Sequence, residues 1–136
     1  MTSLIDVMAE QRSEWTSAGK IRACRLPGGV ELVVDGLTTQ GRYYKPLIYE
    51  FFRKDWRDYR PAHGVFEVDI LMEYQGDPPW LDLDNLAKAI LDGLKGHVFH
   101  DDSQVARLLV QRRSGERERV TVRADLRTTA GPAAGS

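Results

Sequence analysis

The most regular pattern along the chain is an alternation of apolar and polar side chains over residues 65–74. Apolar residues occupy every even position from Phe66 to Tyr74, whereas acidic residues occupy most of the odd positions. Because successive side chains of a strand point to opposite faces, this period of two predicts a half-buried strand. The Gly-Asp-Pro-Pro run at residues 76–79 ends the strand.

Other segments repeat their apolar residues at helical spacing. Over residues 84–95, the leucines and Ile90 share one face, and Gly96 is placed to end the helix. Residues 46–59 open with a proline and carry aromatic and aliphatic side chains at roughly helical intervals, so we predict a second helix there. A weaker pattern of the same kind predicts a helix over residues 3–18.

Three further segments predict strands. Residues 30–35 are rich in valine and follow a Pro-Gly-Gly turn, and residues 104–112 and 118–126 have strand-like composition and alternation. Because a short segment containing Ser114-Gly115 separates the last two, we expect them to form an antiparallel C-terminal hairpin.

The order of these elements predicts the α/β (α+β) fold class, with a mixed sheet and two to three helices. We expect a single domain over residues 1–126 and a flexible tail at residues 127–136. Of the 136 residues, 42% are hydrophobic and 29% are charged, which excludes a disordered chain. No apolar run approaches the ~20 residues of a membrane span, and the first residues are acidic where a secretory signal is basic, so we expect a cytoplasmic protein. The single Cys24 excludes an internal disulfide.

Charge is distributed unevenly, although the net charge is only -1. Residues 61–102 carry two basic and nine acidic residues, whereas residues 21–60 and 103–136 have net charges of +3 and +4. An acidic centre with basic flanks is typical of a cation site beside phosphate-binding surfaces. Chance variation within a single domain gives the same pattern, so the positions of individual residues must distinguish the two.

A first acidic box lies at the start of the predicted helix at 84–95. Asp82 and Asp84 are two residues apart, and in an extended segment their carboxylates point the same way. Lys88 lies one helical turn after Asp84, and Asp92 a further turn on, where it can hold the Lys88 ammonium. The box therefore places two carboxylates and a lysine on one surface.

A second acidic box, Asp101-Asp102, opens the next predicted strand. If that strand lies beside the one that ends near Tyr74, a third carboxylate reaches the first box. Three clustered carboxylates stay ionised together only when a cation neutralises them. Oxygen ligands with room for water and phosphate suit Mg²⁺ or Mn²⁺. Such an ion activates water and polarises a phosphoryl oxygen, so the two boxes indicate phosphodiester hydrolysis.

Ordinary structural roles explain the same residues. Either aspartate of the first box serves equally well as a helix N-cap. Lys88 and Asp92 have the spacing of an exposed ion pair on a helix, and Asp101-Asp102 has the composition of a turn. Spacing alone leaves both interpretations open.

Taken together, the two boxes resemble the signature of RusA-type Holliday-junction resolvases over residues 65–126. The motifs occur in the family's order and spacing as Asp82-x-Asp84-Asn85-Leu86-x-Lys88, Leu91-Asp92-Gly93-Leu94 and Asp101-Asp102-Ser103-Gln104-Val105. The resemblance implies a RusA-like fold and a homodimeric, Mg²⁺-dependent endonuclease, with Mn²⁺ as an alternative ion. Its substrate would be four-way junction DNA, resolved by paired symmetric nicks in recombination and repair.

The resemblance also assigns roles to individual positions. It implies that Asp82, Asp84 and Asp102 are catalytic and hold the metal, with Asp101 as the alternative to Asp102. Lys88 matches the family's catalytic lysine. Two further positions match supporting residues, namely Asn85 and Asp92.

Two basic regions are candidates for DNA contact. The family's basic stretch corresponds here to residues 37–46, where Arg42 and Lys45 accompany two tyrosines that either contact DNA or belong to the core. Arg112 and Arg113 lead a series of arginines that either follow a phosphate backbone or cover a solvated strand face. Residues 1–27 have no counterpart in the family and form an N-terminal extension.

The chain has three tryptophans, Trp15, Trp56 and Trp80, which we predict to be packing residues. Trp80 adjoins the first acidic box, so the alternative is that it gates that box.

Three functional hypotheses follow from these residues. The leading one is a metal-dependent endonuclease that acts on recombination intermediates. The second is a catalytically inactive relative that binds junctions or other DNA. The third is a metal-dependent phosphoesterase that acts on another nucleic-acid structure.

Overall fold

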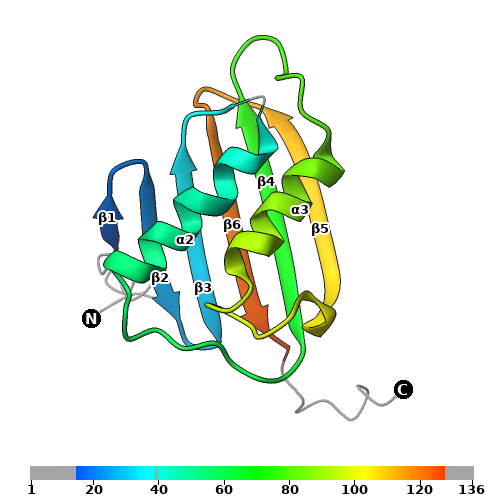
Figure 1. Cartoon of the computed structure of the whole chain (residues 1–136). Coiled ribbons are helices and arrows are strands. Elements are labelled where there is room, and N and C mark those ends of the chain that lie inside the picture. The colour runs from blue at the N-terminus through cyan, green and yellow to red at the C-terminus, as the bar shows by residue number, and fades with distance from the viewer. Residues whose placement is uncertain (1–14, 39, 128–136) are drawn as a thin grey trace, which may run out of the picture.

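The computed structural model describes residues 15–38 and 40–127, which form a mixed six-stranded sheet and two α-helices. The strands lie in the order β1-β2-β3-β6-β4-β5 (Figure 1). The predicted α+β class and mixed sheet are thus confirmed. The elements, including two 3-10 turns, are β1 (Thr16–Ala18), β2 (Ile21–Leu26), β3 (Gly29–Asp35), η1 (Gly41–Tyr43), α2 (Tyr44–Lys54), β4 (Phe66–Tyr74), α3 (Leu83–Leu94), η2 (Asp102–Gln104), β5 (Val105–Ser114) and β6 (Arg119–Leu126).

Both α-helices lie on the same face of the sheet (Figure 1). In β4, the even-numbered side chains from Phe66 to Met72 are at most 1% exposed, whereas Asp69 on the other face is exposed. The helices meet this apolar face with their own apolar stripes, and Leu86, Ile90 and Leu94 of α3 are fully buried. The predicted strand at 65–74 and helix at 84–95 are therefore confirmed, with each bound shifted by no more than one residue.

The two helices approach each other closely because Gly93 of α3 has no side chain. A Cβ at Gly93 would lie 3.1 Å from the Cβ of Ile48 in α2. Gly96 adopts the left-handed conformation, with φ of +85°, and follows the last turn of α3 as predicted. The glycine of the Asp92-Gly93-Leu94 motif therefore has a packing role, and the close approach of the helices brings the start of α2 beside α3.

Helix α2 is shorter than the predicted helix at 46–59, since it ends at Lys54. The apolar residues beyond it pack from a loop. Trp56 is 4% exposed and donates from Nε1 to Oγ1 of Thr16 at 3.1 Å, and Tyr59 stacks on Trp56 with ring centroids 5.4 Å apart. These residues look helical in the sequence because they are buried at nearly helical intervals. Neither α2 nor any other helix within the described segments has the length and apolar character required to cross a membrane.

The N-terminal part of the sheet differs from the prediction. The predicted helix at 3–18 is wrong over residues 16–18, which form β1 and pair with β2, and its earlier part lies outside the described residues except for Trp15. β2 was not predicted at all, and it forms a hairpin with β3 in which Leu26 faces Gly29. Two strands thus come from the predicted N-terminal extension at 1–27.

The predicted C-terminal hairpin is also wrong, although both of its strands are present. β5 pairs with β4 in parallel, and β6 runs antiparallel between β3 and β4, so β4 separates β5 from β6. The connection passes the end of β4, where the Gly115 N–H donates to the Tyr74 carbonyl at 2.8 Å. Because α3 returns the chain to the start of β4, the next strand enters parallel to it. Most of the predicted tail lies outside the described residues, which end at Arg127.

Candidate functional site

The first acidic box spans the start of α3. Asp82 occupies the N-cap position, but its side chain makes no capping hydrogen bond. Asp84 lies in the first helical turn, where the helix dipole favours a carboxylate. Both side chains are exposed. Neither carboxylate therefore caps the helix as the N-cap interpretation requires, and both are accessible to a ligand.

Asp84 lines a groove of about 500 Å³ between α3 and β5, which we call the carboxylate groove. Most of its lining is apolar, and its charged members are three aspartates and one lysine. The complete set is Leu83, Asp84, Ala87, Lys88, Leu91, Asp92, Asp102, Leu108 and Val110. The fold therefore brings a residue from each acidic box to one groove.

Asp102 lies at a different end of the sheet from the one that the sequence predicted. β5 is parallel to β4 and Val105 lies beside Phe66, so Asp102 is near the start of β4 and not near its end at Tyr74. Helix α3 runs back between these two ends of the sheet. A helix of 12 residues is about 18 Å long, so Asp84 and Asp102 lie toward opposite ends of the groove.

The expectation that Asp82 and Asp84 point the same way is not met, because Asp82 has an extended backbone and Asp84 is helical. Asp82 lines a separate groove together with Trp80 and Arg112. Within residues 15–38 and 40–127, no group of three or more Asp, Glu, His or Cys side chains is placed to hold a metal ion. The three-carboxylate cage is thus not formed. Mg²⁺ commonly binds through one or two carboxylates, completing its shell with water and substrate phosphate, and the carboxylate groove fits that donor set.

The two aspartates of the second box have different environments. The Asp101 carboxylate accepts a hydrogen bond from the Ser103 N–H at 3.0 Å and lies 3.2 Å from Lys95 Nζ. These partners lower the pKa of Asp101 to about 2, the Ser103 hydrogen bond being the largest cause. Asp102 is exposed and faces the carboxylate groove. The structure therefore gives Asp101 a structural role and leaves Asp102 accessible.

Gln104, the last polar residue of the second box, joins two loops. Its Oε1 accepts from the backbone N–H groups of His100 and Asp101 at 2.7 and 3.0 Å. Its Nε2 donates to the carbonyls of Ala62 and Gly64, each at 2.9 Å. This side chain fixes the loop that carries Asp102 to the loop before β4. The sequence reasoning did not assign it a role, although its place in the motif was the available signal.

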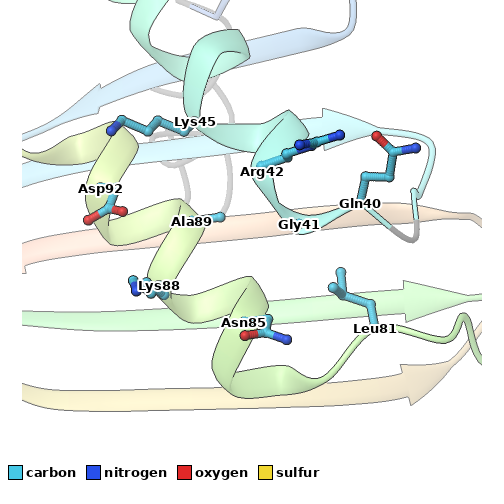
Figure 2. A pocket seen from close by; sticks show the side chains of 9 residues that line it. All are labelled: Gln40, Gly41, Arg42, Lys45, Leu81, Asn85, Lys88, Ala89 and Asp92. Atoms are coloured by element: carbon cyan, nitrogen blue, oxygen red, sulfur yellow. The ribbon is translucent and has the colours of Figure 1, made fainter.

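A second groove, of about 580 Å³, lies on the other side of α3, between that helix and η1 with the start of α2 (Figure 2). We call it the basic groove, because three of its four charged residues are cations. Its lining residues are Gln40, Gly41, Arg42, Lys45, Leu81, Asn85, Lys88, Ala89 and Asp92. Gly41 allows the close approach of η1, since a Cβ there would lie 3.4 Å from Leu81 Cδ1.

The basic groove brings together residues from two regions that are separate in the sequence, the basic region at 37–46 and the first acidic box. Arg42 and Lys45, predicted to contact DNA, face Lys88 and Asn85 of the first acidic box across this groove. In Figure 2, Lys45 and Asp92 lie at one end of it, and Gln40 and Leu81 lie at the other. Tyr44, between the two cations, is fully buried, so it belongs to the core and not to a DNA-contacting loop.

Lys88 and Asp92 line both grooves. The described part of the chain contains no ion pair between them, so the predicted contact is absent. The Lys88 ammonium is therefore not neutralised by Asp92. It lies on the ridge of α3 that separates the basic groove from the carboxylate groove.

Arg112 and Arg113 belong to opposite faces of β5. Arg112 donates from Nη2 to the Leu81 carbonyl at 3.2 Å, next to the first acidic box. Arg113 lies on the helix-free face, where its Nη2 is 3.7 Å from Glu73. Other arginines of that face also pair with acidic residues, namely Arg107 with Asp69, Arg119 with Glu73, Arg123 with Asp125 and Arg127 with Glu67. These pairs support the solvated-face interpretation for Arg113 and for the arginines named with it, but not for Arg112.

The prediction that Trp80 packs in the core is wrong. Its side chain is 93% exposed and lines the groove that also contains Asp82 and Arg112. Trp56, in contrast, is buried as predicted. The sequence offered one signal for the difference, which is that Trp80 follows two prolines and has no apolar periodicity around it.

The chain was also compared with known proteins. No curated protein matches it significantly. Residues 37–124 match the family model described as Endodeoxyribonuclease RusA. The matched segment contains every residue that lines the three grooves described above. Because the match covers more than half of the chain, we conclude that this protein belongs to the RusA family of endodeoxyribonucleases.

Proposed function

We propose that this protein is a Mg²⁺-dependent endonuclease that resolves four-way DNA junctions by paired, symmetric hydrolysis of phosphodiester bonds. Its membership of the RusA family supports an endodeoxyribonuclease that acts on junction DNA. The single observation that carries the proposal is the position of Lys88, which lines both the basic groove and the carboxylate groove.

The basic groove supports the binding of a DNA strand. Arg42, Lys45 and Lys88 outnumber the one acidic residue, Asp92, so a phosphate in this groove meets net positive charge. Lys88 then lies between the bound phosphate and the carboxylates on the other side of α3. An ammonium in this position stabilises the negative charge that develops on a phosphate under attack.

The carboxylate groove supports the binding of the ion. We propose that Asp84 and Asp102 each present a carboxylate to a Mg²⁺ ion, or Mn²⁺ in its place, at their own end of the groove, and that Asp82 presents another from the neighbouring groove. When bound, the ion supplies an activated water and polarises a phosphoryl oxygen. The protein's own part is to present the carboxylate oxygens and to place the Lys88 ammonium. Asn85 lines the basic groove beside Lys88, and we propose it, together with Asp92, as a supporting residue.

We propose that the active protein is a homodimer, because a two-fold axis presents two equivalent sites to a four-way junction. β5 supports this, since it is an edge strand of the sheet and Leu109, on its helix-free side, is 37% exposed. An edge strand offers unpaired backbone groups to a second strand. Leu109→Asp should yield monomers in analytical ultracentrifugation and uncouple the paired nicks. A variant that remains dimeric would exclude this edge as the contact.

The test of the proposed activity is a nicking assay with Mg²⁺ on a synthetic four-way junction, a flap, a linear duplex and a single strand. We expect paired cuts at symmetric positions in the junction and much slower cutting of the other substrates. Asp84→Asn should abolish cleavage while junction binding persists or tightens, because the substitution removes a negative charge that repels phosphate. The matched control is Asp55→Asn, at an exposed position after α2 and outside all three grooves, which should cut like the wild type.

Each alternative gives a distinct result in the same assay. Junction binding without cleavage, at several divalent metals and pH values, would identify an inactive DNA-binding relative. Equal or faster cleavage of the flap, the duplex or the single strand would identify a phosphoesterase for another nucleic-acid structure. Undiminished cleavage in the presence of EDTA would contradict the metal dependence.

A further inference from the structure

Trp80 is by far the most exposed large apolar side chain in the part of the chain that the structure describes. It is 93% exposed, whereas the next most exposed large apolar side chain, Tyr49, is 49% exposed. Tryptophan carries the largest apolar surface of any side chain, and its burial in contacts contributes strongly to binding. An indole held in water thus has a large amount of binding surface available to a partner.

The loop that carries Trp80 holds the indole in a defined position. The Leu81 N–H donates to the Pro79 carbonyl at 2.8 Å, which closes a three-residue turn with Trp80 at its centre. Pro78 and Pro79 restrict the backbone on one side of the turn. On the other side, Leu81 is 6% exposed and its carbonyl accepts from Arg112. The turn projects Trp80 outward from a fixed base.

The surroundings of Trp80 combine an apolar surface with charge. Its groove is lined by both prolines and by Arg112, Asp82 and Asp77. Arg112 uses one N–H on the Leu81 carbonyl, and a guanidinium has five N–H donors, so others remain for a phosphate. An unpaired nucleotide has the matching chemistry, because it presents an apolar base face and an anionic phosphate. The centre of a protein–protein interface is depleted in charged residues, so the three charged neighbours disfavour a second copy of the chain, and Arg112 is the one among them that attracts a phosphate.

We propose that Trp80 is a stacking platform for an unpaired nucleobase beside the scissile phosphate, and that Arg112 contacts the phosphate of that nucleotide. The inference rests on the proposed action on DNA, and it adds a recognition element for bases that have left the duplex. Stacking on an aromatic ring is tolerant of base identity. Trp80 therefore distinguishes open from fully paired DNA without reading the sequence.

Binding is measured on the full-length protein in EDTA, so that no cleavage occurs. The probes are a ten-nucleotide oligothymidine, a four-way junction and a linear duplex with the same sequence as one junction arm. We expect Trp80→Ala to weaken binding of the oligothymidine and the junction by about 5- to 150-fold, with no effect on the duplex. Trp80→Phe should restore most of the affinity because it keeps a stacking ring. The salt dependence should not change, since neither substitution removes a cation.

Two further measurements separate stacking from a structural effect. Oligothymidine should quench the tryptophan emission of the wild type but not that of Trp80→Phe, which retains Trp15 and Trp56. Because the side chain is exposed, Trp80→Ala should keep the wild-type thermal midpoint. Tyr49→Ala, which removes an exposed ring of α2 outside the three grooves, is the matched control and should bind like the wild type.

The inference is overturned if Trp80→Ala binds the oligothymidine as tightly as the wild type, or if quenching persists in Trp80→Phe. It is also overturned if Trp80→Ala converts a DNA-free dimer to a monomer, because the partner of the ring is then a second copy. Because these measurements involve no cleavage, failure of the stacking proposal can be distinguished from failure of the proposed nuclease function. Quenching by a protein that never cuts junctions would support the stacking site and contradict the nuclease.

Discussion

Lys95 Nζ lies 3.2 Å from Oδ1 of Asp101, and the second oxygen of the same carboxylate accepts from the Ser103 N–H. Both oxygens of Asp101 are thus engaged within their own loop. Asp102, the next residue, is exposed and lines the carboxylate groove. Two adjacent aspartates that are equivalent in the sequence therefore have different environments in the fold.

This difference predicts opposite effects of two substitutions. Asp101→Asn should lower the thermal midpoint slightly, through loss of the contact with Lys95, while cleavage of a four-way junction continues. Asp102→Asn should abolish cleavage and leave the thermal midpoint unchanged. Differential scanning calorimetry and the nicking assay measure the two effects on the same samples. The reverse pattern would make Asp101 the metal ligand.

The low pKa of Asp101 predicts a dependence of stability on pH. The hydrogen bond from Ser103 and the ion pair with Lys95 lower this pKa from 3.8 to about 2. A carboxyl whose folded pKa is depressed stabilises the fold above its unfolded pKa, and this contribution is lost as the pH falls through the folded pKa. The difference in thermal midpoint between the wild type and Asp101→Asn should be constant above about pH 5 and should shrink between about pH 4 and pH 2. A difference that does not change over this range would contradict the assignment.

Lys88 and Lys45 form a matched pair, because both line the basic groove and only Lys88 also lines the carboxylate groove. Lys88→Ala should lower the rate at saturating junction by on the order of 10²-fold, since it removes the charge that we propose lies beside the scissile phosphate. Lys45→Ala should weaken junction binding and leave the saturated rate near that of the wild type. Single-turnover kinetics with titrated protein separate binding from rate, and equal rate losses in both variants would remove the special role of Lys88.

Arg112 and Arg113 provide a second matched pair on neighbouring positions of β5. Arg112→Ala should weaken junction binding and reduce the slope of log K against log salt by about 0.9, the value for one phosphate contact on duplex DNA. Arg113→Ala should change neither, because Arg113 faces Glu73 on the helix-free side, where Glu73 keeps Arg119 as a partner. Fluorescence anisotropy over a salt series measures both slopes. A smaller slope for Arg113→Ala would place DNA on the other face of the sheet.

Local periodicity accounts for the parts of the fold that could be predicted. β4 and α3 each bury one side only. The spacing of apolar residues within each segment is therefore enough to predict which side is buried. β2 escaped prediction because two arginines interrupt its apolar residues. The signal that could have revealed it is the two-residue connection to β3, in which Leu26 faces Gly29.

Strand partners could not be predicted in the same way, because pairing joins residues that are distant in the chain. The short connection between β5 and β6 favoured a hairpin, yet β4 lies between them. β6 buries Val120, Val122 and Ala124 completely, so a central position beside β4 covers its apolar face. β5 is mostly exposed and occupies the edge. Burial of apolar surface outweighs nearness along the chain.

The amino-acid sequence by itself determined which polar groups the proposed site can use, since the carboxylates of the two acidic boxes and Lys88 follow from residue identity alone. It also determined the family, because the motifs are read in chain order. Only the tertiary structure decided which of these groups meet. It placed Asp102 and Asp84 toward the two ends of one groove, and it placed Asp82 in another groove with Trp80 and Arg112. The physical reason is that the direction of a side chain depends on the backbone conformation of its residue and on the packing of its element, and neither is encoded in spacing alone.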